Sequence, residues 1–263
     1  MTKVPKTVAD ECRDALNALL AESDRFRDWN SSEIQSIVQA VERLKEADAR
    51  EAYIRLGCIA TICGNVDGLL ESYGKALLLQ EAQDTKHEFW VSLANAGLYR
   101  KAQEVGSWLL DPRRGFFPKI WQLASSRGQV LEVWGRLSDA MKTYPELSGV
   151  DFSALKGVAL LMEARGLTDQ DVISVLDLMG EIQRAHRVMF YGDFVSIPKE
   201  MRPPDDPPYL YFTIPLSVSV DELHAMNREL AKHVVERLPE GAFPQGMVAA
   251  FAKAEPLALR AAA

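Results

Sequence analysis

The sequence predicts a mainly α-helical protein that ends in a small α+β part, and three observations support this. Apolar side chains recur every three or four residues through most of the first 186 residues, which is helical spacing. A pattern of aromatic, small and glycine residues returns between residues 50 and 147. In residues 209–218 the apolar side chains instead alternate with polar ones, which is typical of a β-strand.

The composition is that of an ordinary globular protein. The 263 residues are 48% hydrophobic and 25% charged, so they can bury a substantial core without disulfides. The net charge of −7 argues against a nucleic-acid-binding surface, which needs a basic footprint. We predict a helical repeat domain over residues 1–165 and a small α+β domain over residues 166–263, with a proline-rich loop at 201–208.

Several classes of protein are disfavoured by what the sequence lacks. No apolar run is long enough to span a bilayer, and the first residues lack the apolar core and small-residue cleavage site of a secretory signal, so we expect none. The three cysteines have no framework spacing, which indicates a reducing compartment, and we expect the protein to be cytoplasmic. The four histidines lack a metal-ligand spacing, and no phosphate-binding loop occurs. We therefore expect no metal, no cofactor and no catalytic residue.

The helices are predicted in pairs along the chain. Residues 7–22 and 31–46 each carry one apolar stripe and form the first hairpin. Residues 50–63 and 66–80 form the second, and Gly64-Asn65 between them supplies the left-handed conformation of a tight turn. Glycine inside a helix is unfavourable, so the glycine at position 57 is expected to let a second helix approach closely.

The second hairpin is the first copy of a repeating pattern. It contains Tyr53, Leu56, Gly57, Ala60, Gly64, Leu69, Tyr73 and Ala76. A further copy contains Phe89, Trp90, Leu93, Gly97, Ala102, Gly106 and Leu109. The last contains Phe117, Ile120, Trp121, Ala124, Gly128, Val133, Leu137 and Ala140. The turn glycines are thus 33 and 31 residues apart.

This pattern resembles the tetratricopeptide-repeat family, whose unit of about 34 residues is a pair of helices. Trp90 and Trp121 depart from it, because the family usually has a small residue there. The resemblance implies a right-handed array of helical hairpins with a concave groove lined by the inner helix of each pair. Mapped onto this chain, the groove residues are Ile54, Cys58, Thr61, His87, Val91, Asn95, Pro118, Gln122 and Ser125. The basic residues with which some members clamp an acidic peptide are missing at these positions, so an apolar or mixed ligand is expected.

The carboxyl-terminal part follows another helical hairpin, residues 152–164 and 168–186. Residues 187–197 have the composition of a strand, and residues 209–218 alternate as a strand does. A helix that begins after Ser219 and a last strand over residues 246–254 complete the order strand, strand, helix, strand. The crossover would make the last two strands parallel.

We expect a non-enzymatic protein that binds another protein or peptide, as an adaptor, a regulator or a neutraliser of a toxin or effector. Two alternatives stay open. One is an enzyme with an acidic site in the α+β domain, where the candidate residues are Asp193, Asp205, Asp206 and Tyr209. The other is a homo-oligomeric scaffold that associates through a strand edge.

Overall fold

The structure is a computed structural model, and it describes residues 8–22, 24–110, 121, 124–125, 127–144, 147, 151–189, 199–201, 209–238 and 246–254. These contain ten helices and three strands. The helices are α1 (Val8–Glu22), α2 (Ser32–Ala47), α3 (Ala49–Cys63), α4 (Val66–Leu79), α5 (Gln83–Asn95), α6 (Tyr99–Leu109), α8 (Val130–Thr143), α9 (Ser153–Arg165), α10 (Asp169–Ala185) and α11 (Val220–Arg237). The strands are β1 (Lys199–Met201), β2 (Tyr209–Leu216) and β3 (Met247–Lys253).

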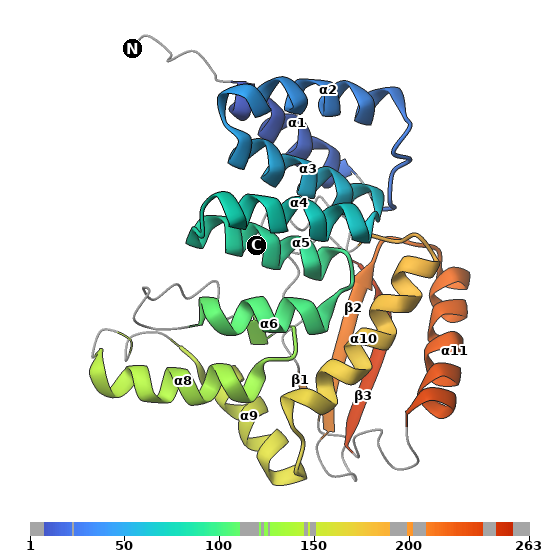
Figure 1. Cartoon of the computed structure of the whole chain (residues 1–263). Coiled ribbons are helices and arrows are strands. Elements are labelled where there is room, and N and C mark those ends of the chain that lie inside the picture. Colours follow the sequence, from blue (N-terminus) through green and yellow to red (C-terminus); the bar gives the residue numbers. More distant parts are fainter. Residues whose placement is uncertain are drawn as a thin grey trace, which may run out of the picture.

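The helices pack in neighbouring pairs, as predicted (Figure 1). The pairs α1–α2, α3–α4 and α5–α6 follow one another through the structure, and α8 and α9 lie beyond them (Figure 1). One core cluster lies among α1, α2 and α3, and a second runs from α3 to α8. Among the described residues, no helix is long and apolar enough to cross a membrane.

Four turns between helices are closed by a glycine with positive φ. Gly64, Gly97, Gly128 and Gly166 have φ between 66° and 91°, a region that favours glycine. In each turn the residue after the glycine donates its backbone N–H to the carbonyl five residues earlier, over 2.8–3.1 Å. This is the hydrogen bond that ends a helix in a Schellman motif. The turn role predicted for Gly64 is therefore confirmed.

In each of two successive helix pairs, a glycine on one helix faces a large aromatic side chain on the other. The glycine lies on the first helix of one pair and on the second helix of the next. In the pair α3–α4 the small residue is Gly57, and a Cβ there would lie 2.5 Å from the ring of Tyr73 on α4. In the pair α5–α6 the large residue is Trp90 on α5, and a Cβ on Gly106 of α6 would lie 2.9 Å from its Nε1. The predicted close approach at Gly57 is confirmed. The departure at Trp90 is explained by the glycine opposite it.

Helix α10 runs along the turns of the array and joins it to the carboxyl-terminal part. Gly180 lies against the turn glycine Gly97, and Arg184 donates to the carbonyl oxygen of Gly97 over 2.5 Å. Nearer the N-terminus of α10, Val172 and Leu176 lie against the turn at Gly128. The residues of α10 that contact the Gly128 loop and the Gly97 loop are thus roughly 10 Å apart along the helix axis. This distance matches the spacing of packed helices.

Two carboxylates of α10 cap helices of the array. Helix α6 has no side-chain cap of its own, and Asp177 accepts from the backbone N–H of Arg100 over 3.0 Å. Helix α8 also lacks one, and Asp169 accepts from the N–H groups of Leu131 and Glu132, both over 2.9 Å. A carboxylate at a helix N-terminus satisfies unpaired N–H groups and stabilises the helix dipole.

The carboxyl-terminal part is a three-stranded sheet in the order β1-β2-β3. Strand β1 pairs antiparallel with β2, and β2 pairs parallel with β3 through the crossover helix α11. The predicted parallel pair and the alternation along β2 are confirmed, because Leu210, Phe212, Ile214 and Leu216 are buried. These residues share one core with α9, α10 and α11.

The strand predicted over residues 187–197 is wrong where it can be checked. Arg187 has φ 54°, a left-handed conformation that ends α10 instead of starting a strand. Val188 forms only an isolated bridge with Arg25. Residues 190–198 lie outside the described part, and the first strand is β1 at Lys199–Met201.

The connection between α1 and α2 is joined to the end of α10 by hydrogen bonds across 160 residues. Phe26 donates its N–H to the carbonyl of Arg187 over 3.0 Å, and Met189 donates to Asp24 over 3.1 Å. Arg25 also donates to both carboxylate oxygens of Glu222 on α11. The first hairpin is thereby attached to the carboxyl-terminal part.

Candidate functional site: a pocket at the inner helices

A pocket of about 240 Å³ opens where α1, α3 and α5 meet. These are the first helices of three successive pairs, so they correspond to the inner helices of the predicted array. The pocket is lined by Arg13, Leu16, Asn17, Leu20, Arg55, Cys58, Thr61, His87, Glu88, Val91, Ser92 and Asn95.

The predicted groove residues fall into three groups in the structure. Five of them line the pocket: Cys58, Thr61, His87, Val91 and Asn95. Ile54 is 2% exposed and packs in the core, and Ser125 is 3% exposed; neither lines the pocket. Pro118 and Gln122 lie outside the described residues.

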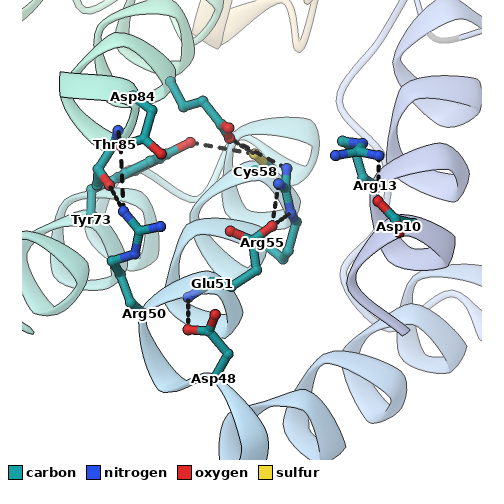
Figure 2. Close-up of polar contacts among 11 residues, drawn as sticks. Asp10, Arg13, Asp48, Arg50, Glu51, Arg55, Cys58, Tyr73, Asp84 and Thr85 are labelled. Atoms are coloured by element: carbon teal, nitrogen blue, oxygen red, sulfur yellow. Dashed lines mark hydrogen bonds and ion pairs between the residues drawn. The ribbon is translucent and has the colours of Figure 1, made fainter. Parts of the chain in front are cut away.

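A buried arginine crosses from one helix pair to the next at the pocket wall. Arg55 on α3 is only 6% exposed. It donates to Glu51 through Nε over 2.8 Å and through Nη2, and to Glu88 on α5 through Nη1 over 3.3 Å. Figure 2 shows Arg55 with Glu51, and beside them Arg50, which donates to Asp84. The mapped groove positions carry no lysine or arginine, but Arg13 and Arg55 lie beside them in the pocket lining, each paired with carboxylates.

The Glu88 carboxylate accepts hydrogen bonds through one of its two oxygens. Burial raises the pKa of its carboxyl group; Arg55 lowers that pKa, and the neighbouring Glu51 and Asp84 raise it further. Its side chain is still 36% exposed. Only its Oε2 accepts a hydrogen bond within the described part of the chain. The other oxygen is available to a ligand.

A chain of polar side chains links Cys58 to α5 through α4. The Cys58 thiol lies 3.3 Å from the hydroxyl of Tyr73, which lies 2.9 Å from the hydroxyl of Ser92 (Figure 2 shows the first two). Burial raises the pKa of Cys58 to about 11, so the thiol is protonated at neutral pH. A protonated thiol is a poor nucleophile, and this cysteine therefore packs and hydrogen-bonds instead of reacting.

Asn95 lies in the wall of the pocket with one polar atom unsatisfied. The residue is 4% exposed, and its Oδ1 has no hydrogen-bond partner within the described ranges. A buried acceptor without a donor costs free energy, typically about 1–3 kcal/mol. This oxygen has almost no accessible surface, so a ligand would reach it only after the side chains around it moved.

Helix α1 supplies the opposite wall, which the sequence pattern did not predict. Leu16 and Leu20 give it an apolar surface, and Asn17 lies exposed at its edge. Arg13 pairs with Asp10 over 2.5 Å and faces the side of α3 that carries Arg55 (Figure 2). The repeat pattern begins only at Tyr53, so α1 carried no groove assignment.

Arg55 and Glu88 were also missed, and the sequence does contain a signal for them. They are 33 residues apart, the same interval that separates the turn glycines of their two helix pairs. Opposite charges at equivalent positions of neighbouring inner helices predict an ion pair between repeats.

The described residues do not form the acidic site that was considered for the carboxyl-terminal domain. Asp193, Asp205 and Asp206 lie outside them, and Tyr209 begins β2 with a partly exposed side chain. Within the described ranges, no group of three or more His, Cys, Asp or Glu side chains could hold a metal ion.

No protein-family model, curated protein or solved structure matches the chain.

Proposed function

We propose that this is a non-enzymatic protein–protein interaction protein with a tetratricopeptide-like array, in which the inner face at α1, α3 and α5 holds a segment of another protein. Its work would be that of an adaptor, a regulator or a neutralising partner. The observation that carries the proposal is the pocket itself, which combines side chains from three successive inner helices on one face. Helical arrays use such extended surfaces for binding.

The size and chemistry of the pocket support a protein partner over a small substrate. Its volume of about 240 Å³ is below the range of about 300–1,000 Å³ in which drug-sized molecules bind. It suits one side chain of a longer ligand. The lining contains a protonated thiol and a paired arginine, which suit recognition better than covalent catalysis.

A site-specific crosslinker at the pocket edge tests the proposal. Asn17 is exposed there, and it can be replaced by the photo-reactive residue p-benzoylphenylalanine. The matched control carries the same residue at Leu78 on α4, which is 88% exposed and away from the pocket. We expect a discrete crosslinked protein in the native host from position 17 and none from position 78.

A variant that blocks the pocket tests whether the crosslink depends on it. Val91→Glu places a charged side chain in the pocket wall and should abolish the crosslink from position 17, while circular dichroism shows that the helices persist. Equal crosslinking from both positions, or a crosslink that survives Val91→Glu, would reject binding at this face.

A further inference from the structure

Strand β3 is an edge of the three-stranded sheet, because among the described strands it pairs with β2 alone. Their ladder begins where Leu210 donates its N–H to the carbonyl oxygen of Gly246 over 2.7 Å, and it ends where Ala254 donates to Leu216 over 3.0 Å. Successive residues of a strand point their backbone N–H and C=O groups to opposite sides. The residues whose groups point away from β2 are therefore Met247, Ala249, Phe251 and Lys253.

At Phe251 this outer side is occupied by an amide side chain. The crossover helix α11 lies beside β3 (Figure 1), and it carries Asn227. Asn227 Nδ2 donates to the carbonyl oxygen of Phe251 over 2.9 Å, and the N–H of Phe251 donates to Asn227 Oδ1 over 2.8 Å. The opposite orientation of the amide would set donor against donor and acceptor against acceptor, so the backbone of Phe251 fixes how Asn227 points.

These two hydrogen bonds are the ones that a neighbouring strand would make. In a hydrogen-bonded pair of antiparallel strands, two opposed residues exchange both N–H···O bonds. The primary amide of Asn227 offers one acceptor and a donor, as a backbone residue does, and it stands where the opposed residue would be. A further strand could pair at Phe251 only after Asn227 had moved away.

Without Asn227 the edge would suit pairing with another chain. Residues 247–253, MVAAFAK, contain no proline, glycine or acidic side chain, and their one charge is that of Lys253 at the end. Edges of this kind recruit other strands unless a charge, a proline, a bulge or a covering element protects them. With Phe251 occupied, Met247 and Ala249 remain on one side of the block and Lys253 on the other.

We propose that Asn227 closes the edge of β3 against strand addition, and that the strand it excludes is β3 of a second copy of this chain. Two identical edges can pair antiparallel about a two-fold axis, which makes the two copies equivalent. The inference does not depend on the proposed function, since the residues that line the pocket come from α1, α3 and α5. A scaffold that associates through this edge would require Asn227 to leave Phe251.

The test measures the oligomeric state of the full chain by sedimentation velocity over a wide range of concentrations. We expect the wild type to stay monomeric. Asn227→Ala should dimerise at least about ten-fold more tightly than the wild type, because both outward groups of Phe251 lose their partner. Arg228→Ala changes the next, exposed residue of α11 and is the matched control, which should stay monomeric.

A second substitution shows whether the dimer uses this edge. Proline has no N–H, and on the outer side of an edge strand it prevents pairing without removing a bond to the inner neighbour. The N–H of Ala249 is on the outer side of β3, so Asn227→Ala combined with Ala249→Pro should return the protein to a monomer. Asn227→Ser is a milder change whose side chain is too short to reach both groups of Phe251, and it should also dimerise. Circular dichroism shows whether each variant is folded.

Four outcomes would overturn the proposal. These are a folded Asn227→Ala protein that stays monomeric, dimers that persist after Ala249→Pro, association of Arg228→Ala or of the wild type as strong as that of Asn227→Ala, and unfolding of both Asn227→Ala and Asn227→Ser. The last outcome would assign Asn227 to the stability of the fold instead of the protection of its edge.

Discussion

Gly180 of α10 and Gly97 of the α5–α6 turn touch through their backbones, with no room for a side chain between them. A Cβ built on Gly180 would overlap the carbonyl oxygen of Gly97, and a Cβ on Gly97 would lie 2.9 Å from the Cα of Gly180. The contact joins the helical array to the core of the carboxyl-terminal part. Its neighbours on both sides are rigid helices, so neither backbone can yield cheaply.

Gly180→Ala should therefore destabilise the protein by about 3 kcal/mol, at the upper end for an overpacked site. Gly74→Ala is the matched control, because Gly74 also lies inside a helix but a Cβ there meets nothing within 4 Å. Alanine at position 74 should stabilise by about 0.5–1 kcal/mol. Urea unfolding of both variants measures the difference, and equal effects would contradict the close contact.

Removing either capping carboxylate of α10 should destabilise helices of the array. Asp169→Ala and Asp177→Ala are each expected to cost about 1–2 kcal/mol, as for the loss of an N-cap. Asp169→Asn keeps an acceptor and should cost less. Asp139→Ala, whose side chain is 78% exposed, should stay within about 0.5 kcal/mol. Unfolding free energies that do not separate these variants would contradict capping by α10.

The contact between Gly57 and Tyr73 should give a coupled pair of mutations. Gly57→Ala alone drives a methyl group into the tyrosine ring, and we expect a loss of about 2 kcal/mol. Tyr73→Leu alone loses the hydrogen bond to Ser92. In the double variant the smaller side chain makes room for the methyl group, so the combined loss should fall short of the sum by about 1 kcal/mol. Simple additivity would show that the two side chains do not compete for space.

The attachment of the first hairpin to α11 should depend on pH. The hydrogen bond from Arg25 holds the pKa of Glu222 below the ordinary value of 4.5. A lowered folded-state pKa means that the ionised group stabilises the fold above the ordinary pKa, and that this contribution is lost as the pH falls through the folded-state value. Glu222→Gln should thus be less stable than wild type at pH 7 and equal to it in strong acid. Arg25→Gln should also lose stability at pH 7, but part of its loss should persist in acid, because Arg25 also donates to the backbone carbonyl of His186. For Glu222→Gln, a difference that persists in acid would assign it to packing.

The sequence predicted the features whose cause is local. Amphipathic spacing gave the helices, and the turn glycines gave the breaks between them, because both depend on residues within one or two helical turns. Gly180, Asp169 and Asp177 were not predicted, since their partners lie 37 to 83 residues away and the sequence of α10 alone shows an ordinary amphipathic helix.

The site was predicted only in outline for a related reason. Ile54 and Arg55 are neighbours, about 100° apart around the helix axis, and the repeat pattern could not tell which of them faces the pocket. The isoleucine turned to the core and the arginine to the pocket wall. The unpaired oxygen of Asn95 is visible only when the packing of α5 against its neighbours is known.

The course of α10 limits how this protein can evolve or be redesigned. Repeat proteins are commonly lengthened or shortened by whole units, because each unit touches only its neighbours. Here the 17-residue helix α10 contacts two of the turns. Its Gly180, Asp177 and Arg184 contact the Gly97 turn and the start of the helix after it, and its Asp169 caps the helix after the Gly128 turn. A helix pair inserted between the turns at Gly97 and Gly128 would move one of these turns out of register with α10. The spacing of the two turns is therefore set by a helix that lies outside the pairs they close.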